Sequence, residues 1–307
     1  MSALLPHLLH ALDRGDELGL TTLVKWVPKC WLGNEPRTNR NWDTIDYKTA
    51  GASSWYNSLQ VVLNKRLSHD IEFQSSYTWS KMLDETQSQL GDENTASSSR
   101  GPDPSNRKLD KGLSSFDLAH NWRFNTIYRL PSFVPSAGTA DKLLNGWWLS
   151  GILTIRSGYP FTPEISSNRS RSKTGGAGRD HPDLAPGRNF DEIILGGPER
   201  YFDPTGFMIQ PAGFLGNVGR NTLRGPGFVN LDFTVAKDTP LAFLGESGKL
   251  EFRAEFFNLL NRANFASPNR TVYAGTADVQ APLATAGQIT GTVGTSRQVQ
   301  LALKILF

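Results

Sequence analysis

Charged side chains recur at alternate positions of several extended segments, and these residues have the clearest chemical potential. Side chains two residues apart in a strand share one face of a sheet, so each segment would carry its charges opposite its apolar residues. Eight charges fall in such positions: Glu72, Arg123, Arg129, Arg156, Asp232, Glu251, Arg253 and Glu255. Inside a barrel they would face the lumen and could line the path of a polar substrate.

The same charges have a structural interpretation. Opposite charges on adjacent strands pair and stabilise a sheet without any substrate, and we favour this explanation. Glu251 and Glu255 share a face with Arg253 between them. The three side chains could therefore neutralise one another.

A second group of polar residues lies in the longest segment without strand character. Asp180-His-Pro-Asp183 and Asp203 combine carboxylates with a histidine, a set that could hold a metal ion. Asp and Pro are also ordinary turn residues, and the sequence favours turns here. No Ser/His/Asp or Cys/His set has a usable context. We therefore expect no enzyme activity, no metal and no cofactor.

The segment 216–227 is rich in glycine and carries Arg220 and Arg224. Successive backbone N–H groups in such a loop can form an anion-binding nest. The segment lacks the lysine of a phosphate-binding P-loop and a helix signal after it. A loop that leads into a strand at Phe228 is the favoured interpretation.

Composition restricts the class of protein further. The chain has 307 residues and a formal net charge of +3, which is too small to argue for nucleic acid or an acidic partner. Its one cysteine, Cys30, excludes an intramolecular disulfide framework and a cysteine-based zinc site. The mean hydropathy of -0.37 is compatible with a membrane barrel, because only alternate residues of barrel strands face lipid.

The first part of the chain does not share the alternation that follows it. No stretch has the roughly 20 apolar residues of a spanning helix. The N-terminus lacks a basic region, and Pro6 and His7 interrupt its apolar run, so it is not typical of a signal peptide. Segment 20–27 has no regular face. We leave residues 1–50 unassigned and expect the export signal to be missing from this chain.

Seven segments alternate apolar and polar residues and are predicted strands: 56–66, 71–81, 121–130, 146–157, 228–237, 250–258 and 297–307. They run near the roughly 9–11 residues of strands that cross a bilayer at a tilt. The last segment keeps one apolar face up to the final residue, with Val299, Leu301, Leu303, Ile305 and Phe307. A terminal aromatic there fits the belt that marks the membrane–water boundary of outer-membrane barrels.

Large aromatic residues lie near strand ends on the predicted apolar face: Tyr77, Trp79, Trp122, Tyr128 and Trp147. A soluble core uses such residues too. Their placement at strand ends favours an interfacial aromatic belt.

The connections alternate between short or moderate and long: 68–70, 82–120, 131–145, 158–227, 238–249 and 259–296. Outer-membrane barrels have short periplasmic turns and long extracellular loops. Counting back from a periplasmic C-terminus puts every long connection outside. The sequence therefore predicts an all-β fold, an antiparallel up-and-down transmembrane β-barrel segment with about seven strands of a larger barrel.

Several phrases together resemble the C-terminal barrel of TonB-dependent receptors, specifically the Oar-like group with a carboxypeptidase-regulatory-like N-terminal domain. They are SWYNSLQ at 54–60, YTWSK at 77–81, GWWLSGILT at 146–154, RSGYPF at 156–161, GNVGRNTLRGP at 216–226 and FRAEFFNLLN at 252–261. The resemblance covers residues 51–307. It implies a protein of the Gram-negative outer membrane, related to 22-stranded barrels that carry an N-terminal plug and import siderophores, glycans or other large nutrients.

The resemblance also implies partners. These are outer-membrane lipid, the barrel assembly machinery acting on the C-terminal strand, and TonB in an intact receptor, with no nucleic acid. The chain departs from the family because it shows no TonB box, plug or regulatory-like domain. We therefore expect an apparently truncated receptor barrel that does not transport alone.

Two alternatives stay open at this point. One is a soluble secreted β-sandwich that binds carbohydrate through its aromatic residues, and the other is a gene fragment without function. A sandwich would bury the apolar strand face against a second sheet. A membrane barrel would leave that face as a continuous band about 25 Å tall with aromatic rims.

Overall fold

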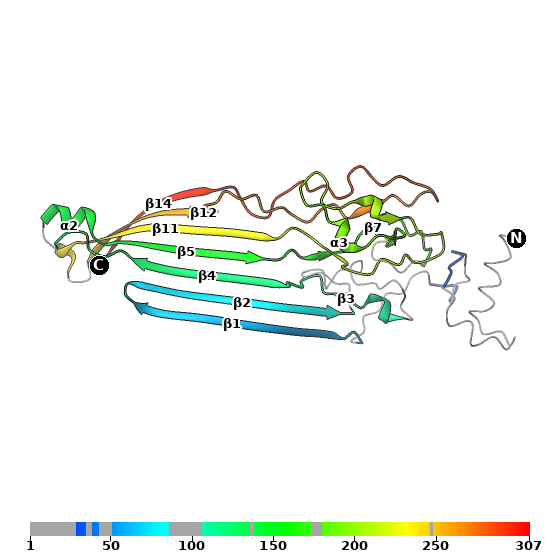
Figure 1. Ribbon diagram of the computed structural model, residues 1–307, viewed down its shortest axis with the longest axis horizontal. Helices are drawn as coiled ribbons and strands as arrows, with labels where there is room; N and C mark the ends of the chain where they lie inside the picture. Colours follow the sequence, from blue (N-terminus) through cyan, green and yellow to red (C-terminus); the bar gives the residue numbers. More distant parts are fainter. Residues whose placement is uncertain are drawn as a thin grey trace.

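A computed structural model describes residues 29–34, 39–42, 51–85, 103, 106–135, 138–172, 180–245 and 248–307. One large antiparallel sheet dominates it (Figure 1). Its long strands are β1 (Ser54–Ser68), β2 (Ile71–Asp84), β4 (His120–Arg129), β5 (Trp147–Arg156), β11 (Phe228–Pro240), β12 (Lys249–Phe257) and β14 (Gln298–Leu306). All seven predicted strands are present, and each pairs with the next long strand along the chain. The up-and-down order predicted from the sequence is confirmed.

The shorter connections lie at one end of the sheet and the long connections at the other (Figure 1). At the turn end, where the C-terminus also lies, are a tight turn at His69 and Asp70 and the connections with α2 (Gly138–Leu144) and η5 (Ala242–Leu244). At the opposite, loop end are the described parts of the three long connections. This arrangement is the one that the alternating lengths predicted.

Short elements give the long connections their structure. They are η2 (Arg107–Asp110), β3 (Gly112–Leu113), β6 (Pro160–Phe161), β7 (Glu164–Ile165), β8 (Asp183–Leu184), α3 (Phe190–Ile193), η4 (Pro204–Gly206), β9 (Phe207–Met208), β10 (Leu223–Arg224) and β13 (Thr271–Tyr273). β3 adds to the end of β2, and the parallel pair of β7 and β13 joins two long connections. We call the described parts of 157–227 and 258–297 the loop assembly.

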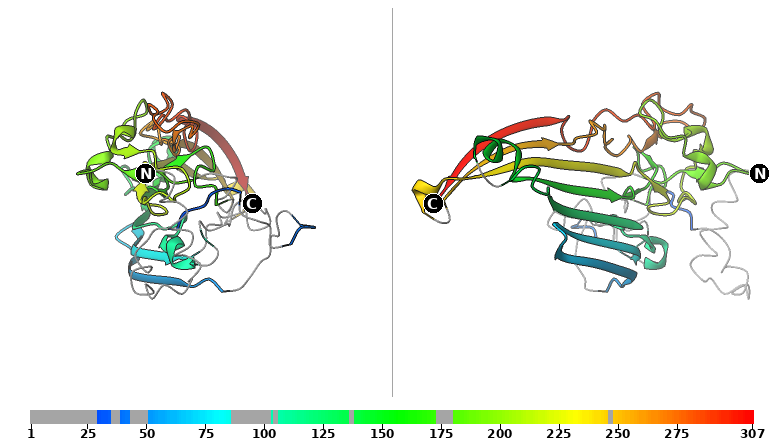
Figure 2. Two further views of the ribbon diagram at one scale, coloured as in Figure 1. Left: turned by 90° about the vertical axis from the view of Figure 1, so that its right-hand side faces the viewer. Right: turned by 60° about the vertical axis from the view of Figure 1, so that its left-hand side comes forward.

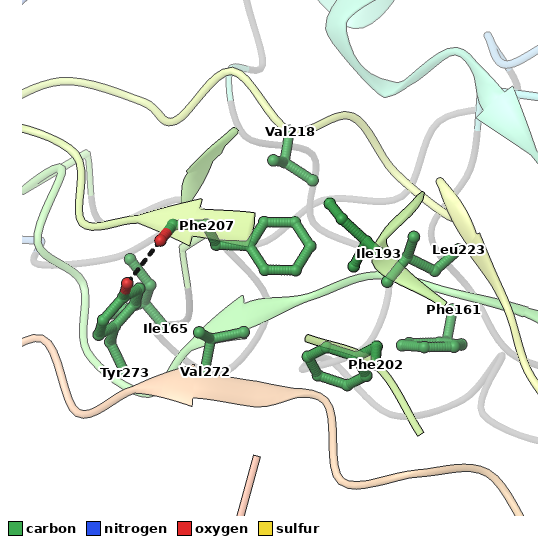
Figure 3. Packing of buried hydrophobic residues seen from close by; sticks show 9 residues of the cluster. All are labelled: Phe161, Ile165, Ile193, Phe202, Phe207, Val218, Leu223, Val272 and Tyr273. Atoms are coloured by element: carbon green, nitrogen blue, oxygen red, sulfur yellow. Dashed lines mark hydrogen bonds between the residues drawn. The ribbon is translucent and has the colours of Figure 1, made fainter. Parts of the chain in front are cut away.

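The main hydrophobic core lies in the loop assembly and not in the sheet (Figure 3). Its buried members are Phe161, Ile165, Ile193, Phe202, Phe207, Val218, Leu223, Val272 and Tyr273. The Tyr273 hydroxyl donates a hydrogen bond of 2.7 Å to the carbonyl of Phe207. The connections 157–227 and 258–297 therefore form a packed unit, which the sequence did not predict.

The N-terminal segment contributes to this unit where it is described. The Trp31 N–H donates to the Gly213 carbonyl at 2.8 Å, and Lys29 pairs with Asp103 at 3.4 Å. Segment 20–27, for which the sequence gave no assignment, lies outside the described residues.

Strand register joins the apolar residues into one continuous face. A row toward the loop end consists of Val61, Tyr77, Trp122, Ile155 and Val229. A row toward the turn end consists of Tyr128, Leu149, Val235, Ala254 and Leu301. The other sheets among the described residues are two-stranded pairs in the loops, and Leu301 is 68% exposed. The sandwich alternative is wrong, because no second sheet in the described structure buries this face.

The sheet curves into an arc and is not a closed barrel (Figure 2). β1 and β14 are its two edges, and no described strand pairs with the outer side of either. An unpaired backbone group in hydrocarbon costs several kcal/mol. Both edges therefore need further strands when the sheet lies in a membrane. No helix among the described residues is long and apolar enough to span a membrane.

The two faces of β14 give a direct test of which face meets lipid. Leu301→Arg places a charge on the apolar face near the middle of the strand. We expect it to lower the free energy of unfolding of the full-length gene product in lipid vesicles by about 2–4 kcal/mol. Urea titration with a heat-shift gel readout measures the change.

Gln300→Arg is the matched control. Gln300 lies directly across from Glu255 on the polar face, so the same new charge should be tolerated there. Equal losses in the two variants would contradict a lipid-facing apolar side.

Candidate functional site: the polar sheet face and the loop assembly

Strand register also places the eight predicted charges on one face, opposite the apolar band. Glu72 lies across from Ile127, Arg129 from Trp148, and Asp232 from Ile152. Arg123 and Arg156 share that face on β4 and β5, and Glu251, Arg253 and Glu255 share it on β12. Their role as lumen lining stays a prediction, although the shared face is the one it requires.

Toward the turn end the charges form a ladder of alternating sign. The Lys249 ammonium lies 2.6 Å from the Asp238 carboxylate and 3.8 Å from that of Glu251. Arg253 lies 2.5 Å from Glu251 and 3.7 Å from Glu255. Arg253 therefore does sit between two carboxylates, as its spacing in the sequence suggested. These contacts support the structural interpretation for this part of the face.

Toward the loop end the polar face is held by hydrogen bonds and aromatic contacts. The Arg156 guanidinium lies 4.7 Å from the Phe228 ring centroid and 5.3 Å from that of Tyr159. The Asp232 carboxylate accepts from the Asn258 N–H at 2.9 Å. This ties the end of β12 to β11 and fixes where the last long connection leaves the sheet.

Three of the predicted charges are left for other contacts. Glu72, Arg123 and Arg129 form no ion pair with any residue that the structure describes. The ladder explains the charges on β11 and β12 near the turn end but not these three, which lie on β2 and β4. Together with Arg156, they are the members of the set that could meet a polar ligand.

Two ion pairs clamp the loop assembly to the end of β2 and to the connection that follows it. Arg220 donates to the Asp84 carbonyl at 2.7 Å and to the Asp84 carboxylate, and both side chains are 4% exposed. Arg224 pairs with the fully buried carboxylate of Asp117 and donates to the Gly158 carbonyl at 3.2 Å. Both arginines of the glycine-rich segment thus bind groups within the chain, and the nest interpretation gains no support.

Glycines of the same segments permit close backbone contacts. A Cβ at Gly158 would lie 1.8 Å from the Gly225 carbonyl oxygen, and one at Gly216 would lie 2.1 Å from that of His181. Only a residue without a side chain fits at these distances. Gly158 of the phrase RSGYPF and Gly216 of the phrase GNVGRNTLRGP are therefore explained by packing.

The suggested metal ligands point to separate partners. Asp180 accepts from the Ser170 N–H at 2.5 Å and hydroxyl at 2.9 Å, and His181 Nδ1 lies 2.9 Å from the Val218 carbonyl. Asp183 accepts from the Asn217 N–H at 2.7 Å. Among the described residues no three His, Cys, Asp or Glu side chains gather as metal ligands would.

Asp203 caps η4 instead. Its carboxylate accepts from the Thr205 N–H at 3.0 Å and hydroxyl at 2.6 Å, and it pairs with Arg188 at 2.5 Å. Burial opposes ionisation, but the Thr205 hydrogen bonds and Arg188 outweigh it and lower the pKa of Asp203. The residue acts as a turn residue, in agreement with the favoured interpretation.

Burial shifts the pKa values of Asp180 and His181 in opposite directions. It raises the pKa of Asp180, although the Ser170 hydrogen bonds partly offset it. It lowers the pKa of His181, although the Val218 carbonyl and the nearby Glu164 and Asp180 partly offset it. Burial disfavours the charged form of both groups.

The predicted belt residues lie on the apolar face toward both ends of the strands. Tyr77, Trp79 and Trp122 are toward the loop end, and Tyr128 and Trp147 toward the turn end. Ile155, which pairs with Trp122, lies eight positions after Trp147. At about 3.4 Å per residue this spans about 27 Å along the strand. The spacing suits an apolar band about 25 Å tall, and the interfacial role stays a prediction.

A curved antiparallel sheet with one apolar and one polar face, and with its long connections at one end, defines the wall of a membrane β-barrel. The protein family described as "Outer membrane beta barrel domain" matches residues 27–300, so the chain belongs to this family. It is an outer-membrane protein. No curated protein and no solved structure matches the chain.

Sequence reasoning missed the acidic halves of the two clamps. Asp84 ends β2 and Asp117 lies in the next long connection, and each was an ordinary polar residue in its segment. Their arginine partners are 136 and 107 residues away. No local pattern could have found the pairs.

The Asp84–Arg220 clamp predicts a large effect of a small change. Asp84→Asn removes the negative charge of this buried pair, and breaking a buried pair from one side typically costs about 3–5 kcal/mol. We expect hydrogen exchange of segment 216–226 to accelerate accordingly.

Asp278→Asn is the control for that change. Asp278 pairs with Arg169 but is 84% exposed, so its loss should cost less than about 1 kcal/mol. If the amide hydrogens of segment 216–226 exchange no faster in Asp84→Asn than in Asp278→Asn, the Asp84–Arg220 clamp does not hold the loop assembly.

His181 predicts a dependence of loop stability on pH. Its folded pKa is lowered from 6.5, so below pH 6.5 the unfolded segment binds a proton that the folded one does not. Stability should be full above that pH and fall as the pH drops, by at most about 1.4 kcal/mol per pH unit. Protection factors for peptides across 180–218 at pH 7.5 and 5.5 measure it. His181→Asn keeps a donor toward Val218 but does not titrate, and an unchanged slope in this variant would exclude His181 as the cause.

Proposed function

We propose that this chain is part of the barrel wall and extracellular mouth of a TonB-dependent, Oar-like receptor that takes up or holds a large nutrient. One observation carries the proposal. The connections 157–227 and 258–297 meet at one end of the sheet and fold into a cored assembly. Asp84–Arg220 joins this assembly to the end of β2, and Asp117–Arg224 joins it to the connection after β2. A simple anchor in the membrane needs no such rigid mouth.

The polar face supplies groups suited to a polar ligand. Glu72, Arg123 and Arg129 lie along it without described ion partners, and Arg156 stands at its loop end between two aromatic rings. Tyr159, one of those rings, is 43% exposed. Exposed aromatic and guanidinium faces can stack on sugars or other flat groups. The proposed role is binding and passage, without catalysis, metal or cofactor.

The remaining surfaces fit the partners of such a receptor. The apolar face would contact outer-membrane lipid. The strand that ends in Phe307, which is 92% exposed, would be the segment that the barrel assembly machinery recognises. TonB would act at the turn end of the intact receptor, and nucleic acid has no part.

Surface labelling tests the proposed orientation. In the full-length gene product with Cys30→Ser, Glu199→Cys in the loop assembly should react with a membrane-impermeant maleimide on intact cells. Lys142→Cys in α2 should react only after permeabilisation, because α2 lies at the turn end. The opposite pattern would reverse the orientation and contradict the proposal.

TonB engagement separates a receptor from another outer-membrane barrel. A photo-crosslinker at Lys142 in correctly oriented protein should give an adduct with TonB that is absent from tonB-deleted cells. Correct labelling without any adduct would reject the receptor class and leave the barrel assignment intact.

A further inference from the structure

An open apolar depression lies on the outward face of the sheet toward its loop end. Tyr77, His120, Trp122 and Ile155 line its volume of about 380 Å³. Tyr77, Trp122 and Ile155 belong to one cross-strand row. The depression therefore lies within the apolar band, near its outer rim.

The polar atoms of its lining are paired with one another or with the sheet. The Tyr77 hydroxyl and His120 Nδ1 are joined by a hydrogen bond of 2.8 Å, and their rings stack. The Trp122 indole N–H donates to the Ser75 hydroxyl at 2.9 Å. The carbon faces of the rings are left to line the depression, which suits a hydrocarbon chain.

Two lysines stand on the same outward face beyond the aromatic residues. Lys81 follows Trp79 by two positions and Tyr77 by four, so its backbone lies about 7 and 14 Å further toward the loop end. The Lys111 ammonium lies 4.2 Å from the ring centroid of Trp55, which is on that face of β1. Both lysines are exposed.

Neither ammonium is neutralised within the described chain. Neither lysine forms an ion pair with a described residue. The nearby carboxylates serve other groups, Asp84 and Asp117 through their arginines, and Glu85 through the Ser53 N–H at 3.3 Å. Positive charge just outside an apolar band complements an anionic headgroup whose chains lie in that band.

We propose that the depression and these two lysines form a binding site for one phosphate-bearing lipid of the outer leaflet. An acyl chain lies against Tyr77, Trp122 and Ile155, and the headgroup phosphate binds Lys81 and Lys111. The inference rests on the proposed contact of the apolar face with outer-membrane lipid. Because Lys111 comes from the connection between β2 and β4, the lipid also holds that connection near the rim.

The test uses full-length gene product purified in mild detergent, with lipid A, a phosphorylated and acylated disaccharide, as the probe. Native mass spectrometry measures its retention and apparent Kd. Lys81→Gln with Lys111→Gln should weaken binding about thirty-fold, which corresponds to about 1 kcal/mol for each lysine. Lys142→Gln in α2 removes the same charge at the other end of the sheet and should leave the Kd unchanged.

A second variant tests the hydrocarbon half of the site. Ile155→Trp fills the depression without adding charge and should weaken lipid A binding but not the binding of inorganic phosphate. Dephosphorylated lipid A, tested on the unaltered protein, should lose the same factor as the double lysine variant. This measurement decides the headgroup role even if the variant does not fold.

Three outcomes would overturn the site: unchanged affinity in the double lysine variant, unchanged affinity in Ile155→Trp, or full competition by inorganic phosphate. Heat-shifted migration is read on the same samples, and the TonB adduct is read in cells that produce the same variants. If lipid A does not bind but the TonB adduct still forms, the lipid site is contradicted and the receptor proposal stands. Lipid binding without an adduct defeats the receptor proposal alone.

Discussion

The register of the large sheet is the constraint on which the other features depend. Successive side chains point to opposite faces, so a slip of one residue between any two strands would turn an apolar row toward the polar side. Seven strands keep their rows aligned, from Val61 on β1 to Leu301 on β14. This alignment pairs the backbone N–H and C=O groups of neighbouring strands and separates a lipid-compatible face from a polar one. A one-residue slip in any pair would therefore disturb both faces of the wall.

The loop assembly has a hydrophobic core of its own and lies at the loop end of this sheet. Close glycine contacts lie within it around a small core, and ion pairs join it to Asp84 at the end of β2 and to Asp117 in the connection that follows. A buried ion pair is weak evidence of net stabilisation, but removing one of its two partners costs several kcal/mol of folding free energy. The clamps thus fix where the assembly sits more than they raise its stability. A fixed position is what a ligand-binding mouth requires.

Charge is used differently on the two faces. On the polar side, Lys249, Glu251 and Arg253 neutralise one another near the turn end, while Arg123 and Arg129 are left without described ion partners. On the outward side, charge is confined to the margins of the apolar band, where Lys81 and Lys111 lie beyond the aromatic residues. The same chain can therefore contact a polar ligand and a lipid headgroup without mixing the two surfaces.

The sequence by itself determined the strands, their two faces and the separation of short from long connections. The two-residue period is a local property, so it can be recognised in each segment without the rest of the fold. It also placed Arg253 between Glu251 and Glu255. Only the tertiary structure decided the partners of Arg220 and Arg224, the packed core from Phe161 to Tyr273, and the depression beneath Lys81. These features join segments about a hundred residues apart, and such contacts follow from the folded path of the chain.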